Sequence, residues 1–251
     1  MRIRAVLTDL DGTLLEPDGS LSPEAREALR ELSQRGVPVV PLTSKTRREL
    51  ADWLGVHDCG RYGSFENGAG VVTPGGVEIA KGALPVAALR TALARARSDA
   101  GRLVSVDDLS DSELSELTGL PPERLADLRA REYDLPFLAP DVPRDELARL
   151  VAGLAEDVVL VAGGRFWHLM GRHGKREAAE RLLELLPGEG AVLGLGDAPN
   201  DDFLDLADVA IVVPRPTGAD PELLRLAPNA RVAVAPAGRG WAQAVESVLR
   251  A

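Results

Sequence analysis

The chain of 251 residues contains a single cysteine, Cys59, so no disulfide can form within it. One unpaired cysteine is typical of a reducing compartment, and we expect a cytoplasmic protein. No stretch approaches the roughly 18 consecutive apolar residues of a membrane helix, and the N-terminus shows no signal-peptide pattern. We therefore expect no membrane span and no membrane partner.

Positive charge is also scarce, because 29 basic residues face 39 acidic ones and the net charge is −10. This balance argues against nucleic acid or an anionic membrane surface as a partner. Lysine occurs only at positions 45, 81 and 175, and asparagine only at 67, 200 and 229. Lysine is a compact point charge that arginine cannot always replace, so a retained lysine points to a site-specific role. Few asparagines and 18 prolines suit a heat-adapted protein.

Strand and helix patterns alternate at both ends of the chain, which favours a parallel sheet covered by helices. Strands are expected near 3–7, 37–42, 166–170, 191–195, 208–213 and 231–234. Residues 83–164 instead hold helical patterns near 85–98, 111–130 and 143–155, with short strands near 103–106 and 158–162. We predict an α/β protein with a Rossmann-like parallel-sheet core, formed by 1–82 and 165–251, and an inserted α/β domain, 83–164. The glycine pair 163–164 is expected to form a hairpin or a hinge.

Two carboxylates, Asp9 and Asp11, stand at the end of the first apolar run. Strand side chains repeat with a period of two, so both start on the same face. They repel each other unless a cation is bound, and carboxylate oxygens suit a hard cation such as Mg²⁺. The tetrapeptide Asp-x-Asp-Gly alone is also typical of a turn with solvated acids. A calcium EF-hand is excluded, because that loop needs glycine and glutamate where Leu14 and Ser20 stand.

Two further segments suggest phosphate binding. Thr43, Ser44 and Lys45 follow the second strand, where a hydroxyl and free amides either bind a phosphate oxygen or form an ordinary helix cap. Lys175 opens the helix after the insert, against the helix dipole, which makes a plain surface role unattractive. A nucleotide P-loop is excluded there, since Met170 and Arg176 replace its glycine and its Ser/Thr.

A last acidic segment, Gly194–Asp202, follows another apolar strand. A dinucleotide-binding fingerprint would need glycine where Pro199 stands, so that function is excluded. The segment carries Asp197, with Asn200 and Asp201 close behind it.

The four segments, in this order, resemble the motifs of haloacid dehalogenase-like phosphohydrolases. The resemblance implies that Asp9 is the nucleophile and Asp11 the general acid/base, and that Thr43 and Lys175 bind phosphoryl oxygens. It implies a Mg²⁺ held by the carboxylates of Asp9 and Asp197 and by the main-chain carbonyl of Asp11. Asn200 and Asp201 would orient the metal shell and Lys175, and the insert would be the α/β cap that selects the substrate.

Three strings, 42–46, 131–137 and 163–169, resemble the mannosyl-3-phosphoglycerate phosphatases, although Gly174-Lys175-Arg176 departs from the Lys-Gly expected there. This resemblance implies release of phosphate from a sugar-glycerate ester to give mannosylglycerate, a compatible solute. The candidate substrate-binding residues are Ser44, Lys45, Glu66, Asn67, Arg131, Arg165 and His168. Glu66 and Asn67 are expected to bond sugar hydroxyls. Arg165 and His168 are three residues apart, so both reach a ligand only if their segment bends.

Other functions stay open at this point. A broad sugar-phosphate or sucrose-phosphate-type phosphatase would use the same motifs. A phosphomutase would use the same Asp9 but return the phosphate to a sugar. A non-catalytic ligand-binding relative would normally have lost part of the motif set. A homodimer is compatible with the sequence, which does not fix the oligomeric state.

Overall fold

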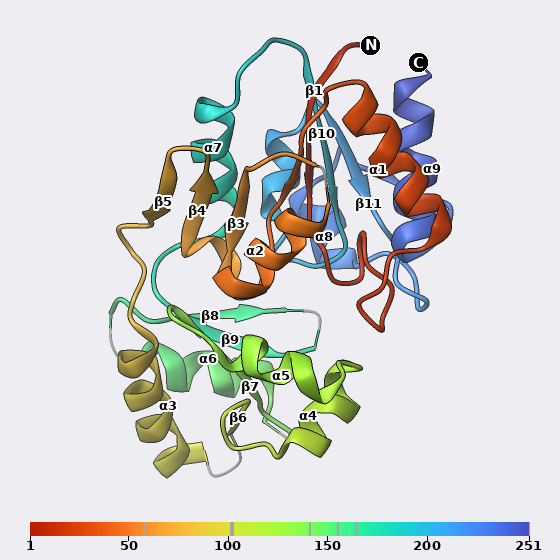
Figure 1. Ribbon diagram of the computed structural model, residues 1–251. Coiled ribbons are helices and arrows are strands. Elements are labelled where there is room, and N and C mark those ends of the chain that lie inside the picture. Colours follow the sequence, from red (N-terminus) through yellow and green to blue (C-terminus); the bar gives the residue numbers. More distant parts are fainter. Residues whose placement is uncertain (58, 101–102, 141, 155, 164, 251) are drawn as a thin grey trace.

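The computed structural model of the protein describes residues 1–57, 59–100, 103–140, 142–154, 156–163 and 165–250. The chain forms two stacked bodies, and the body that holds both termini is built around a parallel sheet (Figure 1). No helix in these described ranges is long and apolar enough to cross a membrane.

The central sheet has five parallel strands in the order β12-β11-β10-β1-β2. Their bounds are β1 Ile3–Thr8, β2 Val39–Pro41, β10 Ala191–Gly196, β11 Val209–Val212 and β12 Arg231–Val232. Strand β1 lies between β10 and β2 and is buried on both faces, as its apolar run, interrupted only by Arg4, predicts. Because all five strands run the same way, their carboxyl ends share one edge of the sheet.

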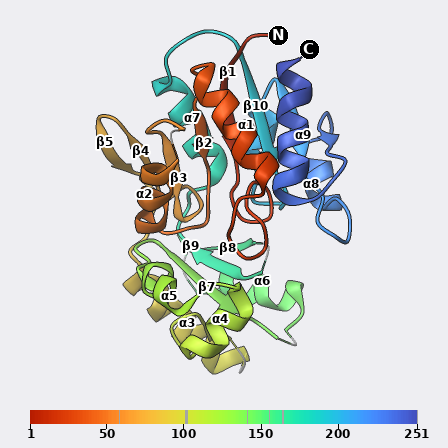
Figure 2. The ribbon, with the colours of Figure 1, turned by 45° about the vertical axis from the view of Figure 1, so that its right-hand side comes forward.

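Helices cover both faces of this sheet and make three layers. Val6 of β1 packs toward α1 (Pro23–Gln34) and α9 (Ala237–Leu249), which lie side by side (Figure 2). Ala5 and Leu7 pack on the other face, toward α7 (Lys175–Leu185) and α8 (Pro221–Leu226). Ser22 caps α1 by accepting a hydrogen bond from the Ala25 amide, as its position before Pro23 predicts.

A small antiparallel sheet continues the edge beyond β2. It consists of β3 (Gly63–Phe65), β4 (Gly70–Thr73) and β5 (Gly76–Ile79), with α2 (Arg47–Val56) and a 3₁₀ turn, Glu66–Gly68, beside it. The Thr43 amide donates to the Ser64 carbonyl at 3.1 Å and joins this sheet to the end of β2. The turn that follows β3 is therefore brought to the same edge as the central strand ends.

The second body is a four-stranded antiparallel sheet in the order β6-β7-β9-β8, covered by helices. Its strands are β6 Val104–Ser105, β7 Asp134–Leu138, β8 Val159–Ala162 and β9 Trp167–Met170, and its helices are α3 Val86–Ala100, α4 Asp111–Thr118, α5 Pro122–Arg129 and α6 Arg144–Ala152. The single helix predicted for 111–130 is wrong: Gly119 ends α4 in the left-handed region, at φ 74°, and α5 begins at Pro122.

The strand predicted near 166–170 exists, but it does not belong to the central sheet. Trp167–Met170 pairs with β7 on one side and with β8 on the other. Placing 165–251 in the core therefore cuts this hairpin, and we propose a boundary near Gly171 instead. Gly164, the last residue of the predicted insert and half of the expected glycine hinge, lies outside the described residues.

Candidate active site

Three of the predicted site residues follow neighbouring strands of the parallel sheet. Asp9 follows β1, Thr43 follows β2 and Asp197 follows β10, so the strand order brings them to one edge. Lys175, the first residue of α7, lies against them. A cavity of about 340 Å³ opens there, between the parallel sheet and the second body. Its lining includes Asp9, Asp11, Ser44, Lys45, Arg131, Arg165, His168, Lys175, Asp197, Asn200 and Arg215.

Lys175 joins two carboxylates at the centre of the site. Its Nζ donates to Asp9 Oδ1 and to Asp201 Oδ1, both at 2.7 Å, and its side chain is 2% exposed. Burial lowers the pKa of Lys175, but the charges of Asp201 and Asp9 outweigh it and raise that pKa above its ordinary value. Lys175 is therefore a fixed positive charge beside Asp9.

Asp197 is held by several groups in an orientation that faces the cavity. Thr13 Oγ1 donates to Asp197 Oδ1 at 3.0 Å, and Arg215 Nε donates to Asp197 Oδ2 at 2.9 Å. The other oxygen of Asp201, Oδ2, accepts from the amides of Asp197 and Ala198. Asp201 thus contacts both Lys175 and the backbone amides of Asp197 and Ala198.

Asp11 points away from this cluster toward Lys45. Lys45 Nζ lies 2.8 Å from Asp11 Oδ1 and 3.9 Å from Glu49 Oε1, and the side chain of Asp11 is 47% exposed. Although burial lowers the pKa of Lys45, Asp11 and Glu49 raise it overall. Two neighbouring carboxylates, Asp9 and Asp11, are therefore each paired to a different lysine.

The carboxylates fit a divalent cation. Asp9, Asp197 and Asp201 each offer a ligand atom, and these atoms lie within 4.8 Å of one another. Burial raises the pKa of Asp9 well above its usual range, helped by Asp201, Asp197 and Asp11 and opposed by Lys175. Burial and Asp201 also raise the pKa of Asp197. A cation at this point would offset the repulsion, and hard oxygen ligands suit it. Asp11 contributes no side-chain ligand to the cluster, so its predicted part in metal binding is confined to its main-chain carbonyl.

The residues around Thr43 form a compact loop. Thr43 is fully buried, and its Oγ1 accepts from the Lys45 amide at 3.1 Å. Ser44 lines the cavity, whereas Thr43 is not among the lining residues. Asn200 Nδ2 donates to Asn67 Oδ1 at 3.0 Å, which ties the segment after β10 to the turn after β3.

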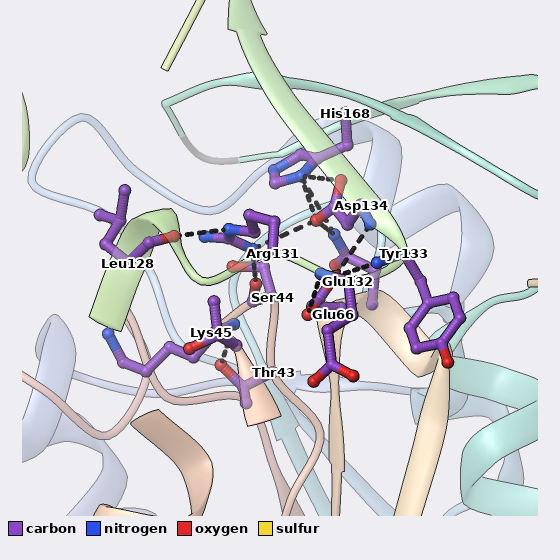
Figure 3. A network of polar contacts seen from close by, with 12 residues as sticks. Thr43, Ser44, Lys45, Glu66, Leu128, Arg131, Glu132, Tyr133, Asp134 and His168 are labelled. Atoms are coloured by element: carbon purple, nitrogen blue, oxygen red, sulfur yellow. Dashed lines mark hydrogen bonds and ion pairs between the residues drawn. The ribbon is translucent and has the colours of Figure 1, made fainter. Parts of the chain in front are cut away.

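The second body contributes Arg131, Arg165 and His168 to the far wall of the cavity. His168 Nδ1 lies 2.8 Å from Asp134 Oδ2, and Arg131 Nη1 lies 3.4 Å from the same oxygen (Figure 3). Arg131 Nη1 also donates to the Ser44 carbonyl. Arg165 donates to the carbonyls of Thr118 and Pro17 and so bridges the two bodies. Arg165 precedes β9 and His168 lies within it, so the two residues do not belong to one regular strand.

Glu66 and Asn67 are not placed to bond sugar hydroxyls. Both are buried, at 0% and 1% exposure, and neither is among the cavity-lining residues. The Glu66 carboxylate accepts from the amides of 132–134, and Asn67 Nδ2 donates to Asp134 Oδ2 at 3.1 Å. The ring of Tyr133 points away from this network (Figure 3) and packs near Phe65. We therefore do not retain Glu66 and Asn67 as substrate ligands.

Sequence reasoning missed Thr13, Arg215 and Asp134. Thr13 stands in the first motif, two residues after Asp11, and its hydroxyl could have been expected near the acidic cluster. Arg215 follows β11, another carboxyl end on the same edge of the sheet, and that position was a usable signal. Asp134 begins β7, and the sequence carries no feature that pairs it with His168.

Known proteins resemble this chain in sequence and in fold. The sequence profile described as haloacid dehalogenase-like hydrolase matches residues 6–103. Glucosyl-3-phosphoglycerate/mannosyl-3-phosphoglycerate phosphatases of Methanococcoides burtonii and Persephonella marina are each 27% identical, covering 97% of this chain and 96% of the relative. Residues 6–103 thus match a haloacid dehalogenase-like hydrolase domain, and relatives along nearly the whole chain are phosphatases by name. The resemblance of the chain to this family, expected from the four motifs, is confirmed.

The fold of this hydrolase is shared by solved structures. A Streptococcus mutans protein superimposes with a TM-score of 0.73 at 18% identity, covering all of both chains. A sugar phosphatase of subclass IIB of the superfamily gives a TM-score of 0.72 at 15% identity over 98% of both chains. The predicted α/β architecture is therefore confirmed. Hydrolases of this superfamily use a divalent metal, and the aspartate cluster of this one is suited to hold it.

Proposed function

We propose that this phosphatase hydrolyses a glycosyl-3-phosphoglycerate, with mannosyl-3-phosphoglycerate as the leading substrate and mannosylglycerate as the product. The carrying observation is a cavity that has the carboxylates of Asp9, Asp11 and Asp197 at one end and five basic side chains in its lining, together with Glu16 and Glu49. The basic residues that line it are Lys45, Arg131, Arg165, Lys175 and Arg215. In a chain of net charge −10, such a local concentration suits a small anionic substrate. The names of the two curated relatives support the substrate.

The proposed first step is attack by Asp9 on the phosphorus atom. An oxygen of the Asp9 carboxylate forms a bond to phosphorus, the ester P–O bond breaks, and an aspartyl-phosphate results. Lys175, 2.7 Å from Asp9 Oδ1, is placed to neutralise charge on the phosphoryl oxygens during this step. Thr43 is assigned to the same phosphoryl group, which requires its buried hydroxyl to become accessible to the substrate.

Asp11 is proposed to move the protons. It gives a proton to the leaving alkoxide, and then takes one from the water that attacks phosphorus and releases phosphate from Asp9. Its partial exposure and its separation from the Asp9–Asp197–Asp201 cluster support this assignment. Two carboxylates with different surroundings thus take different roles.

Mg²⁺ is the metal we propose, held by the carboxylates of Asp9 and Asp197 and the main-chain carbonyl of Asp11. When bound, it supplies positive charge that stabilises the phosphoryl group in the transition state. Asn200 and Asp201 keep the supporting roles expected from the sequence, since Asp201 binds both Lys175 and the Asp197 amide.

The rest of the substrate is assigned to the far wall of the cavity. Ser44 and Lys45 line it beside the phosphate end, and Arg131, Arg165 and His168 line it on the second body. A glycerate carboxylate is bound well by arginine or backbone amides, and sugar hydroxyls are bound by groups that both donate and accept hydrogen bonds. We assign these tasks to the Arg131, Arg165 and His168 group.

The proposal is tested by measuring phosphate release with Mg²⁺ from a panel of esters: mannosyl-3-phosphoglycerate, its glucosyl analogue, sucrose-6-phosphate and mannose-6-phosphate. We expect kcat/KM to be highest for the two glycosyl-3-phosphoglycerates. Release confined to the hexose phosphates would overturn the named substrate but leave the phosphatase assignment intact. Turnover that depends on a sugar bisphosphate and gives no net phosphate would indicate a phosphomutase.

A further inference from the structure

Glu66 places a buried carboxylate at the junction of the two bodies. Its Oε2 accepts from the amides of Tyr133 at 2.6 Å, Asp134 at 2.9 Å and Glu132 at 3.0 Å, and its Oε1 accepts from Glu132 at 3.0 Å (Figure 3). Three consecutive amides of the second body therefore surround one carboxylate of the first. Among the described residues, none forms an ion pair with Glu66 within 4.0 Å, so main-chain donors take the place of a counter-ion.

The backbone of the same turn holds the loop that carries the phosphate-binding candidates. The Glu66 amide donates to the Lys45 carbonyl at 2.8 Å, and the Asn67 amide donates to the Thr43 carbonyl at 3.0 Å. Glu66 and Asn67 both adopt left-handed backbone, at φ 45° and 57°, which side-chain-bearing residues rarely do. A strained backbone conformation of this kind is kept only where several surrounding contacts hold it in place, and such places are often functional sites.

The amides that Glu66 binds belong to the segment that builds the far wall of the cavity. Arg131 immediately precedes them and lines the cavity. Asp134 begins β7, and Pro136 of this strand lies opposite His168 of β9, with both residues on the cavity wall. One glutamate thus contacts the loop at the phosphate end through its backbone and the far wall through its side chain.

We propose that Glu66 is a positioning residue that fixes the span between loop 43–45 and the wall formed by Arg131, Pro136 and His168, and that it thereby selects esters whose leaving group reaches that wall. The inference deepens the proposed function, because it requires a phosphate ester held at both ends of this cavity. The sequence predicted that Glu66 bonds the sugar. In the present proposal Glu66 affects substrate choice by placing other residues and does not contact the sugar.

The arrangement needs a carboxylate in particular. Four amide contacts converge on two anionic oxygens, and charge-assisted bonds of this kind are stronger than neutral ones. Burial raises the pKa of Glu66 to about 7, while the amide of Tyr133 and the charge of Arg131 oppose that rise. Glutamine has the same shape but one neutral acceptor oxygen, and with that oxygen in the place of Oε2 its NH₂ group faces the Glu132 amide that now donates to Oε1.

The test compares Glu66→Gln with Glu132→Gln. Glu132 is the matched control, because its carboxylate bonds Arg47 across the same junction but at the exposed surface. The substrates are mannosyl-3-phosphoglycerate, whose leaving group reaches the far wall under the proposed function, and p-nitrophenyl phosphate, which has a compact leaving group. For Glu66→Gln we expect KM for the long ester to rise about 10-fold, the equivalent of one lost charged hydrogen bond. We expect kcat/KM for p-nitrophenyl phosphate to change less than about 2-fold, and Glu132→Gln to leave both substrates near wild type.

Equal loss with both substrates, or no loss with either, would overturn the inference, because a positioning role predicts a difference between them. If the wild-type enzyme does not use mannosyl-3-phosphoglycerate, the proposed substrate fails, and the same ratio is measured with the sugar phosphate it hydrolyses best. If Glu66→Gln does not fold, Glu66→Asp keeps the charge on a shorter side chain, and the same rise in the KM ratio is expected from it.

Discussion

The two aspartates of the first motif, Asp9 and Asp11, are each paired with a different lysine. Lys175 bonds Asp9 in a buried pocket, whereas Lys45 lies 2.8 Å from Asp11 nearer the surface. Burial raises the pKa of Asp9, so this nucleophile needs the positive charge of Lys175 to stay ionised. The exposure of Asp11 suits a group that exchanges protons with substrate and water. Lys45, expected from the sequence to bind substrate, is thus also placed to hold Asp11 in position.

Replacing Lys45 by methionine should therefore affect esters according to their leaving group. A sugar or glycerate alkoxide needs a proton from Asp11, whereas p-nitrophenolate leaves without one. We expect kcat for the glycosyl-phosphoglycerate to fall about 10- to 100-fold, within the usual range for general acid catalysis. Steady-state kinetics with p-nitrophenyl phosphate should show a much smaller change in kcat. An equal loss of kcat with both esters would contradict a role through Asp11.

For single residues, the sequence predicts those contacts that follow from the order of the parallel strands. Asp9 and Asp197 end adjacent parallel strands, so the meeting of their carboxylates was foreseeable. The task of Glu66 was not, because its partners are main-chain amides 66 to 68 residues away and carry no side-chain signature. Asn67 was misjudged for the same reason, since it bonds Asp134 and Asn200 instead of facing the cavity.

At the scale of elements, the 3₁₀ turn Glu66–Gly68 packs closely against the start of α7, the helix that begins with Lys175. Gly68 has φ +93°, and a Cβ there would lie 2.0 Å from the Gly174 carbonyl oxygen, just before Lys175. The turn thus packs directly against the start of α7, with main chain against main chain. Any side chain at position 68 must displace one of these two elements.

Gly68→Ala is therefore expected to cost about 3 kcal/mol or more of the free energy of unfolding, through overlap with backbone that cannot rotate away. Gly76→Ala is the control, because Gly76 also has positive φ, at +124°, but nothing lies within 4 Å of its Cβ position. Its cost should be only the strain of a left-handed residue, about 1–2 kcal/mol. Urea unfolding of both variants measures the difference, and equal losses would show that the contact with Gly174 is unimportant.

Periodicity predicted most elements of the parallel sheet but misassigned parts of the second body. The runs at 3–7, interrupted only by Arg4, and at 191–195 are neighbouring buried strands, because predominantly apolar residues suit a sheet covered on both faces. The run ending at Met170 has the same character, yet it pairs antiparallel in the other sheet. A local pattern identifies a strand, while its sheet is decided by partners distant in the chain. Strand β7 was not predicted, because it contains Pro136 and proline is unusual inside a sheet.

The molecule as a whole concentrates scarce positive charge at one cavity, and it also concentrates buried negative charge there. Asp9, Asp197 and Asp201 lie together with pKa values of Asp9 and Asp197 raised chiefly by burial. Such a cluster destabilises the folded chain unless a cation compensates it. Binding of the metal and stability of the whole fold should therefore be linked.

We expect Mg²⁺ to raise the midpoint of thermal unfolding by about 5 °C at a hundredfold excess over its Kd, since it binds the native site and not the unfolded chain. Asp197→Asn should lose most of this shift, because one ligand of the cluster loses its charge. Asp145→Asn, on the exposed face of α6, should keep it. Differential scanning calorimetry with and without Mg²⁺ gives the comparison; a full shift in Asp197→Asn would remove that residue from the metal site.

The central claim is that Asp9 is the nucleophile of a glycosyl-3-phosphoglycerate phosphatase. It is tested most directly by phosphate release from mannosyl-3-phosphoglycerate with Mg²⁺ by the wild-type enzyme, by Asp9→Asn and by Asp145→Asn. The account predicts release by the wild type and by Asp145→Asn, and a fall of at least about 1000-fold in Asp9→Asn, because an amide does not replace the attacking carboxylate. Substantial release by folded Asp9→Asn would contradict the account.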